Sequence, residues 1–256
     1  MIDADKTVMK NKVVLITGAG SGLGRATALT FARAGYCVVV SDQSEVAGIE
    51  TSKMVDALGG KALFVRCDVR KELEVQQLLN RTLDTFGRLD CAFNNAGIEE
   101  KGTTLVNCTE AEWDNIMNAN LKGVWLCMKY EIPIMEKQGI GAIVNTSSVA
   151  GLTGFPDSPA YTASKHGVVG LTEAAAIEFA RANVRINAVC PGPIQTAMIE
   201  RFIHGDEKIR KQLMESEPMG RMGTAGEVAE AVFWLCSEHA SYVTGVALPV
   251  DGGYLA

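Results

Sequence analysis

The stretch VVLITGAGSGLG, residues 13–24, decides the fold of this chain. Its four leading apolar residues predict a strand buried on both faces, and the segment that follows has the composition of a helix. Between them, Gly18, Gly22 and Gly24 allow a tight turn, a close approach of the backbone to a phosphate, and packing of the helix start on the strand. A helix N-terminus also attracts an anion. The stretch therefore predicts an α/β fold with a phosphate site after its first strand.

The rest of the chain repeats this alternation of short apolar runs and longer amphipathic segments. We expect strands at 13–16, 38–40, 62–65, 91–93, 142–144, 184–189 and 243–250. We expect helices at about 22–35, 45–58, 71–86, 110–138, 158–181 and 225–237. Because alternating strands and helices imply right-handed crossovers, the sequence predicts a doubly wound Rossmann-type sheet. It is mainly parallel, has about seven strands, and carries helices on both faces.

No linker, repeat or low-complexity tract interrupts the alternation, so we predict a single dinucleotide-binding and catalytic domain over residues 1–256. Residues 191–222 are a local exception, because they combine prolines and glycines with a polar helix around 206–216. Irregular segments of this length often carry function in such folds. We therefore predict a substrate lid at 191–222.

Composition argues against several classes of function. The 256 residues carry a net charge of −6 without a dense basic cluster, so no nucleic-acid partner is expected. No apolar segment reaches the roughly 18 residues of a membrane span, and the first ten residues lack a secretion signal, so we expect a cytoplasmic protein without membrane association. Seven widely spaced cysteines predict reduced, mostly buried thiols. Three scattered histidines give no ligand spacing, so no metal site is expected.

An acidic residue predicts which dinucleotide would bind. Asp42 ends the second expected strand, 20 residues beyond Gly22, where a carboxylate can accept hydrogen bonds from the adenosine ribose hydroxyls. The same charge would repel a 2′-phosphate, and neither Ser21 nor Gln43 offers a positive charge to hold one. These residues favour NAD over NADP. The alternative is that Asp42 is only a turn residue at the end of a strand.

Two further polar segments follow expected strands. The tripeptide CDV, residues 67–69, comes after the third strand, and NNAG, residues 94–97, comes after the fourth. Ligands of open parallel sheets bind at the carboxyl ends of the strands. Either segment alone would be an ordinary turn, but together with the glycine loop they predict an elongated dinucleotide groove.

Three side chains suggest proton transfer beside this groove. Tyr161 and Lys165 are spaced i, i+4, so they share one face of a helix, and Ser148 ends an expected strand ahead of a glycine-bearing loop. Hydride exchange at a secondary alcohol needs a proton carrier on the oxygen. A tyrosine can serve if its pKa, about 10, falls toward neutrality. We expect the ammonium of Lys165 to lower that pKa and Ser148 to orient the substrate oxygen.

These motifs together resemble those of one protein family, the short-chain dehydrogenases/reductases, in the branch of roughly 250 residues. The resemblance spans nearly the whole chain, from about residue 10 to the closing DGG at 251–253. It rests on an ordered series: TGxxxGxG at 17–24, DV at 68–69, NNAG at 94–97, NANL at 118–121, Ser148 with YxxxK at 161–165, and PGPIxT at 191–196.

The resemblance implies a role for each matching residue. Tyr161 would be the general acid/base, Ser148 would orient the substrate, and Lys165 would lower the tyrosine pKa and bind the nicotinamide ribose. Asn120 would hold a water in a proton relay to Lys165. For Asn120 and Thr196, an alternative is that they only satisfy nearby backbone groups. The implied dinucleotide contacts are Gly18, Ser21, Gly22, Leu23, Gly24, Asp42, Asp68, Val69, Asn95, Gly97, Tyr161, Lys165, Pro191, Ile194 and Thr196.

Two expected helices, 110–138 and 158–181, carry wide apolar faces. Burial against the sheet explains part of this. The resemblance implies that these helices also pair across a two-fold axis, so a homotetramer is expected, with a dimer as the second possibility.

The sequence therefore predicts an NAD-dependent oxidoreductase that interconverts a secondary alcohol and a ketone, with Tyr161 as the general acid/base. A 3-oxoacyl-thioester reductase is an alternative within the same family. A non-catalytic NAD-sensing module is an alternative of another class, but such a protein would be expected to have lost Tyr161, Lys165 or Ser148. The mixed apolar and charged residues at 198–207 favour a small cyclic or polyol alcohol as the substrate.

Overall fold

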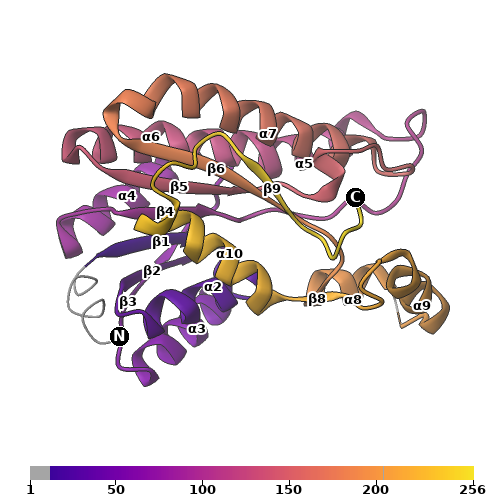
Figure 1. Ribbon diagram of the computed structural model, residues 1–256, viewed down its shortest axis with the longest axis horizontal. Helices are drawn as coiled ribbons and strands as arrows, with labels where there is room; N and C mark the ends of the chain where they lie inside the picture. The colour runs from indigo at the N-terminus through magenta and orange to yellow at the C-terminus, as the bar shows by residue number, and fades with distance from the viewer. Residues whose placement is uncertain (1–11, 204) are drawn as a thin grey trace.

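A seven-stranded parallel sheet forms the centre of the computed structural model, which describes residues 12–203 and 205–256 (Figure 1). The order β3-β2-β1-β4-β5-β6-β9 reverses direction at β1 and β4, as in a doubly wound sheet. The predicted fold class and strand number are confirmed. The strands are β1 (Val13–Thr17), β2 (Cys37–Asp42), β3 (Lys61–Arg66), β4 (Cys91–Asn94), β5 (Gly141–Thr146), β6 (Val184–Pro191) and β9 (Ala247–Val250).

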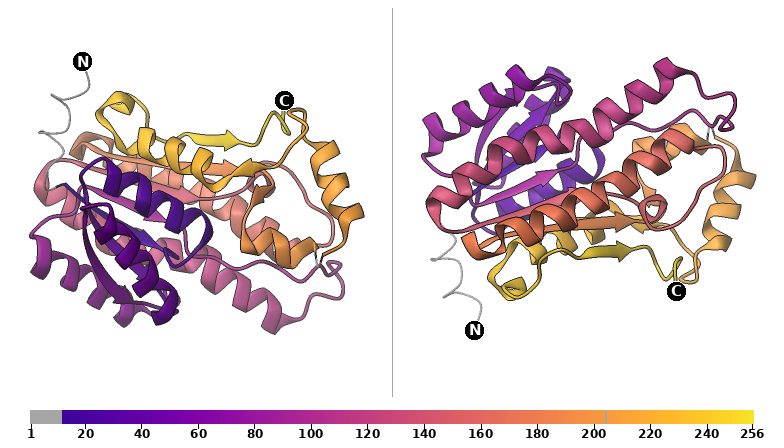
Figure 2. Two further views of the ribbon diagram at one scale, coloured as in Figure 1. Left: turned by 90° about the horizontal axis from the view of Figure 1, so that it is seen from below. Right: turned by 90° about the horizontal axis from the view of Figure 1, so that it is seen from above.

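Helices cover both faces of the sheet, as the two side views show (Figure 2). Because successive side chains of a strand point to opposite faces, Val13 and Leu15 of β1 enter one core and Val14 and Ile16 enter the other. Both cores exclude water, which is why the first strand is a continuous apolar run. One core lies under α2 (Gly22–Arg33), α3 (Glu45–Ala57) and α10 (Ala225–Cys236), and the other lies under α4 (Glu72–Phe86), α6 (Gly123–Gln138) and α7 (Pro159–Phe179).

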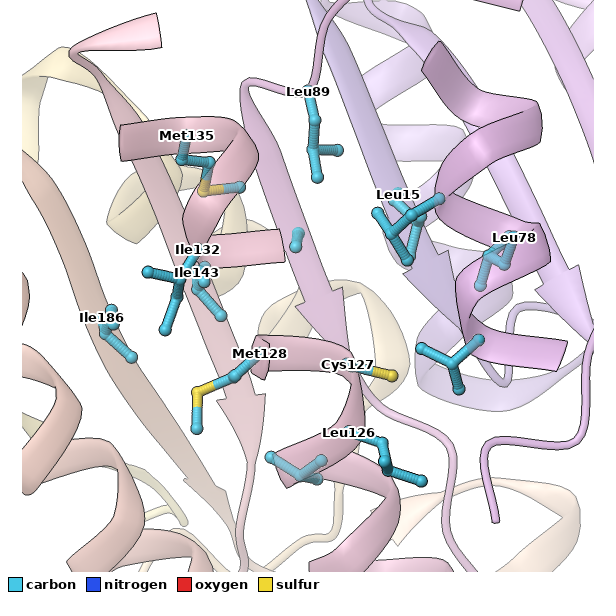
Figure 3. Close-up of a cluster of buried hydrophobic side chains, with 14 of the residues drawn as sticks. Leu15, Leu78, Leu89, Leu126, Cys127, Met128, Ile132, Met135, Ile143 and Ile186 are labelled. Atoms are coloured by element: carbon cyan, nitrogen blue, oxygen red, sulfur yellow. The ribbon is translucent and has the colours of Figure 1, made fainter. Parts of the chain in front are cut away.

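The core beneath α6 fixes the position of the strands that carry the expected chemistry (Figure 3). Met128, Ile132 and Met135 of this helix join one buried cluster with Ile143 of β5 and Ile186 of β6. Each of these side chains is at most 6% exposed. Burying an aliphatic side chain contributes about 2 kcal/mol. This packing therefore holds β5 and β6 in place against α6.

The helix expected at 110–138 is three elements instead of one. The structure has α5 (Glu110–Met117), then a π-helical turn at Asn118–Lys122, then α6. In the π turn the Gly123 N–H donates to the Asn118 carbonyl, five residues back. Apolar spacing cannot reveal such a turn, because it adds one residue without changing the composition. Turns of this kind are rare and occur preferentially at functional sites.

The last strand is shorter than expected. It begins at Ala247 rather than at residue 243. The Val243 carbonyl accepts hydrogen bonds from the side chains of Asn187 and Arg185, at 3.0 and 3.3 Å. Side chains thus replace part of the backbone ladder before β9, although the Gly245 N–H and the Val246 carbonyl already bond to the backbone of β6.

The segment predicted as a lid, 191–222, contains more structure than its sequence indicated. Besides α9 (Glu207–Ser216), which matches the expected polar helix, it includes α8 (Ala197–Ile203). Strands β7 (Ile194–Gln195) and β8 (Gly223–Thr224) pair in parallel and draw the two ends of the segment together. Both helices lie beyond the carboxyl ends of the central strands (Figure 1). Two-residue strands are too short for a periodic signal, so the sequence did not predict them.

Residues 1–11 and 204 belong to the predicted domain, and 204 to the predicted lid, but they lie outside the described residues. Six of the seven cysteine thiols are buried, Cys108 is partly exposed, and all seven are free, as predicted. No helix in the described part of the chain has the length and apolar character needed to cross a membrane. Within 12–203 and 205–256, no three His, Cys, Asp or Glu side chains are grouped so that they could hold a metal ion.

Candidate active site

The glycine loop between β1 and α2 has a geometry that requires glycine. Gly18 and Gly22 have φ values of +62° and +51°, in the left-handed region that side chains disfavour. A Cβ on Gly18 would lie 2.9 Å from the Cα of Ala96, and one on Gly24 would collide with the Gly18 carbonyl oxygen. The loop therefore packs directly against the backbone after β4 and against itself.

The N-terminus of α2 fits the phosphates of a dinucleotide. Its N-cap, Ser21, makes no side-chain hydrogen bond to the first turn, and that turn contains no acidic residue. The side chain of Leu23, the second residue of the helix, packs against the core, which leaves its backbone N–H as the group that could meet a phosphate. Thr196 faces this end from the other side, since a Cβ on Gly22 would lie 3.5 Å from its methyl carbon. Unpaired N–H groups and the helix dipole favour an anion here.

Asp42 lies against the glycine loop, where the sequence placed it. Its Oδ2 accepts a hydrogen bond from the Gly20 N–H at 2.9 Å, and its Oδ1 accepts one from the Ser44 N–H at 2.8 Å. The carboxylate thus forms the turn after β2 and also fixes its own orientation toward the loop. The hydrogen bond from Ser44 agrees with the turn interpretation, and each oxygen keeps a second lone pair that could accept from a ribose hydroxyl.

The residues after β4 brace the loop. The Asn95 side chain donates to the carbonyls of Thr17 and Gly18, at 3.0 and 3.2 Å. The hydroxyl oxygen of Thr17 accepts hydrogen bonds from the backbone N–H groups of Asn95 and Ala96, at 3.0 and 3.1 Å. The amide of Asn95 is thus committed to the loop backbone, although the resemblance assigned it to the adenosine ribose.

The pair expected at the adenine end separates into two environments. The Asp68 carboxylate pairs with the guanidinium of Arg70, with two N···O distances of 2.8 Å, and this neighbour lowers the pKa of Asp68. Val69 is 7% exposed and packs beneath Gly123. Arg70, which carries no motif signal in the sequence, supplies the cation beside Asp68.

The structure brings Tyr161, Lys165 and Ser148 together. The Nζ of Lys165 lies 5.4 Å from the centroid of the Tyr161 ring, and the Ser148 hydroxyl is close enough to lower the pKa of the phenol. Ser148 stands at the start of a short 3₁₀ helix (Val149–Gly151), where its side chain accepts from the Ala150 N–H at 3.2 Å. Pro159 at the first position of α7 starts the helix that carries the other two.

The charges at this site differ from the expectation in one respect. Burial raises the pKa of Tyr161, which outweighs the effect of Ser148, and the expected lowering by Lys165 is not found. Burial also lowers the pKa of Lys165 itself to about 8. Its Nζ donates to the Thr146 carbonyl at 2.9 Å and faces the tyrosine ring. With this pKa the amine is still mostly protonated at neutral pH, and one of its N–H bonds is directed at a carbonyl.

Asn120 is held within the π turn with its side chain fully buried. Its Oδ1 accepts from the Ile98 N–H at 2.8 Å, and its Nδ2 donates to the Ile98 carbonyl at 3.0 Å. A Cβ on Gly97 would lie 3.0 Å from that Oδ1 and 3.8 Å from the Nζ of Lys165. Asn120 therefore clamps the segment after NNAG close to Lys165, which is the backbone-satisfying role weighed as its alternative.

Two contributors to the site had no signal in the sequence. The carboxylate of Glu100 accepts from the Tyr161 N–H at 2.8 Å and so caps the start of α7 from 61 residues away. The carbonyl of Thr146 anchors Lys165. Both act across the edge where β4 and β5 end, and only the topology brings them to α7.

Beyond the last central strands of the site, Pro191 ends β6 and Ile194 is buried in β7. The hydroxyl of Thr196 donates to the Ile194 carbonyl at 3.3 Å. Most of the set expected to contact the dinucleotide thus follows the carboxyl ends of the central strands, from β3 to β6, and continues into β7 of the small two-stranded sheet.

Comparison with known proteins places this geometry among dehydrogenases. Residues 18–255 match the family described as enoyl-(acyl carrier protein) reductase. The chain is 41% identical to 2,5-dichloro-2,5-cyclohexadiene-1,4-diol dehydrogenase of Sphingobium indicum, over 97% of this chain and 98% of that one. It is also 41% identical to levodione reductase of Leifsonia aquatica, over 98% and 96%.

Solved structures agree with these relatives. The crystal structure of levodione reductase superimposes with a TM-score of 0.92 at 42% identity, covering 96% of this chain and 98% of that one. That of NAD⁺-bound xylitol dehydrogenase gives a TM-score of 0.93 at 32% identity, covering 96% and 99%.

Proposed function

Since the chain belongs to the short-chain dehydrogenase/reductase family, we propose that it is an NAD-dependent enzyme that interconverts a secondary alcohol on a small ring with its ketone. The observation that carries the proposal is the convergence of Tyr161, Ser148 and Lys165 beyond the carboxyl ends of the central strands, the same edge of the sheet that carries the glycine loop. Those three groups supply a proton carrier, an orienting hydroxyl and a cation.

The bound nicotinamide would accept or donate the hydride. Tyr161 would take the proton from the alcohol oxygen, or return it to the ketone, while Ser148 holds that oxygen by a hydrogen bond. Because burial raises the pKa of Tyr161, its neutral phenol is ready to donate in the reducing direction. In the oxidising direction the ammonium of Lys165 would stabilise the tyrosinate, and Asn120 would position the relay that carries the proton onward.

The choice of NAD rests on Asp42. Its carboxylate is fixed against the glycine loop by two backbone N–H groups. A carboxylate in that place favours two ribose hydroxyls over a 2′-phosphate, because it accepts hydrogen bonds from the former and repels the latter.

The ring substrate rests on the relatives, since the dichlorocyclohexadiene-diol dehydrogenase and levodione reductase both act on cyclic compounds. The alternative function, a 3-oxoacyl-thioester reductase, is tested by the substrate panel described below. The NAD-sensing alternative is disfavoured because Tyr161, Lys165 and Ser148 are all retained and lie together.

We also propose a cytoplasmic homotetramer that binds neither nucleic acid nor membranes. Support for self-association comes from an apolar hollow over α5, α6 and α7, lined by Met117, Leu121, Trp125 and Leu171. The Trp125 side chain is 43% exposed there, and exposed apolar patches of this kind mark protein interfaces.

Residues 191–222 are proposed to act as a substrate lid. Arg201 of α8 forms two hydrogen bonds with the Glu99 carboxylate, at 2.6 and 3.1 Å. Glu99 follows NNAG and lies near enough to Tyr161 for its charge to raise the pKa of the phenol. The ion pair therefore connects residues 191–222 to the candidate site. It is the link by which the lid would keep its place over the substrate.

Replacing Arg201 with alanine is expected to raise the KM for the alcohol about threefold with little change in thermal stability. The effect is modest because exposed ion pairs contribute under about 1 kcal/mol. Arg210→Ala is the matched control, since Arg210 pairs with Glu200 and Glu207 inside the segment. Equal KM values for the two variants would remove the Arg201 tie from the lid proposal.

The function is tested with a panel of ring and open-chain secondary alcohols, their ketones and an acetoacetyl thioester, each with NAD and NADP. Nicotinamide absorbance reports turnover. We expect the highest kcat/KM with a ring alcohol and NAD. Turnover of the thioester alone would establish the alternative reductase, and NAD binding without turnover of any compound would establish the sensing module.

A further inference from the structure

A carboxyl group that the proposed reaction does not use lies inside the core. Glu131 of α6 is 0% exposed. Its Oε2 accepts a hydrogen bond from the Nδ2 of Asn94, the last residue of β4, at 2.9 Å. The same Nδ2 donates to the Oδ1 of Asn145 in β5 at 3.1 Å. Asn145 in turn donates to the hydroxyl of Thr172 in α7 at 3.0 Å, so the cluster joins two strands and two helices.

Two oxygens in this cluster lack a partner among the described residues, and they belong to the same two side chains. They are the Oε1 of Glu131 and the Oδ1 of Asn94. A buried polar atom without a hydrogen bond costs about 1 to 3 kcal/mol. Both atoms accept but cannot donate while the carboxyl is ionised. A single proton on Oε1 would remove both deficits, since it gives Asn94 a donor.

We propose that Glu131 is a neutral carboxylic acid in the folded protein and that it forms an acid–amide pair with Asn94, with one hydrogen bond in each direction. Glu131 is then a positioning residue for the cofactor groove. Asn94 directly precedes Asn95, whose amide braces the glycine loop, and Asn145 directly precedes Thr146, whose carbonyl anchors Lys165.

The surroundings support the neutral form. Burial raises the pKa of Glu131 to about 7, and the hydrogen bond from Asn94 offsets only part of that rise. The polar side chains around Glu131 are those of Asn94, Asn145 and Thr172. On its own helix, a charge on Glu131 would raise the pKa of the Cys127 thiol. Among the described residues, no cation acts on its pKa.

The sign of the pH dependence follows from these values. The pKa of Glu131 is about 7 in the folded protein, above the ordinary value of 4.5. The contribution of the neutral pair is therefore complete below pH 4.5, falls as the pH rises, and is gone above pH 7. In the folding equilibrium constant this loss amounts to about 300-fold.

Glu131→Gln is the informative variant, because a glutamine amide makes both hydrogen bonds with Asn94 at every pH. We expect the folding constant of the variant, relative to that of the native protein, to rise by about 100-fold between pH 4.5 and 7.5 in urea titrations, which is most of the full change. Glu136→Gln removes an exposed carboxylate from the same helix and should show no such rise. A Glu131→Gln to native ratio that does not change with pH would overturn the proposal.

Infrared spectroscopy tests the protonation state in the native chain, without relying on any variant to fold. In D₂O at pD 6 the exposed carboxyls are ionised, so we expect a protonated carboxyl band of Glu131 that disappears as the pD passes 8 and that remains in Glu217→Gln, which removes the other buried carboxyl with a raised pKa. A spectrum without that band would overturn the proposal. Neither measurement involves turnover, so its failure is separate from failure of the proposed reaction.

The positioning role has its own readout. NAD affinity, followed by protein fluorescence, should fall severalfold more between pH 6 and 8.5 in the native protein than in Glu131→Gln, where the titration of Lys165 still contributes. If the two chains lose affinity in parallel, Glu131 does not position the groove.

Discussion

Tyr161→Phe is expected to lower kcat by about 10³-fold while NADH binding stays within a few-fold of the native protein. The phenol is the only group in the proposed mechanism that exchanges a proton with the substrate oxygen. Phenylalanine keeps the ring that packs under the Nζ of Lys165 and removes only the hydroxyl beside Ser148. Stopped-flow turnover and NADH fluorescence titration measure the two quantities separately.

Tyr242→Phe is the matched control, because it makes the same change on a fully exposed ring. Its kcat should equal that of the native protein. If Tyr161→Phe kept more than a tenth of the native kcat, the proton would have to come from elsewhere and the proposed role of Tyr161 would be wrong.

Asp42→Ala is expected to reduce the preference for NAD over NADP, measured as the ratio of the two kcat/KM values, by about 100-fold. Two hydrogen bonds between ribose hydroxyls and a carboxylate are worth about 3 kcal/mol in total, which corresponds to that factor. The NADP value itself should hold or rise, because the charge that repels a 2′-phosphate is gone.

The control for this prediction separates charge from structure. Asp42 also supports the Gly20 and Ser44 backbone, so thermal unfolding of the variant must be followed in parallel. Glu45→Ala removes an exposed carboxylate three residues away and should leave the cofactor preference unchanged. An unaltered ratio in Asp42→Ala would exclude this residue from cofactor selection.

The central sheet was predictable because its signal is local. β1 and β2 are apolar at nearly every position since both faces are buried, and helices such as α2 begin at the glycine loop and end near a glycine. The placement of Asp42 against the loop and of Tyr161 over Lys165 followed from spacing within one turn or one crossover. Such features can be predicted from residues that are close together in the sequence.

The parts that escaped prediction depend on contacts between distant segments. The π turn lies where Asn120 bonds to Ile98, and ahead of β9 the side chain of Asn187 bonds to the Val243 carbonyl in place of a regular ladder. Likewise the pKa of Tyr161 depends on how deeply the fold buries it. Spacing placed Lys165 near the phenol, but the Thr146 carbonyl that draws its amine aside comes from another strand.

The π turn at Asn118–Lys122 also limits how this chain can change in length. Each residue of an α-helix turns the chain by about 100° around the helix axis. Deleting one residue from the π turn would restore a regular helix and would rotate α5 by that angle relative to α6. The buried Ile116 would then rotate toward water and another side chain would rotate inward. An insertion or deletion at this point is therefore far more disruptive than a substitution.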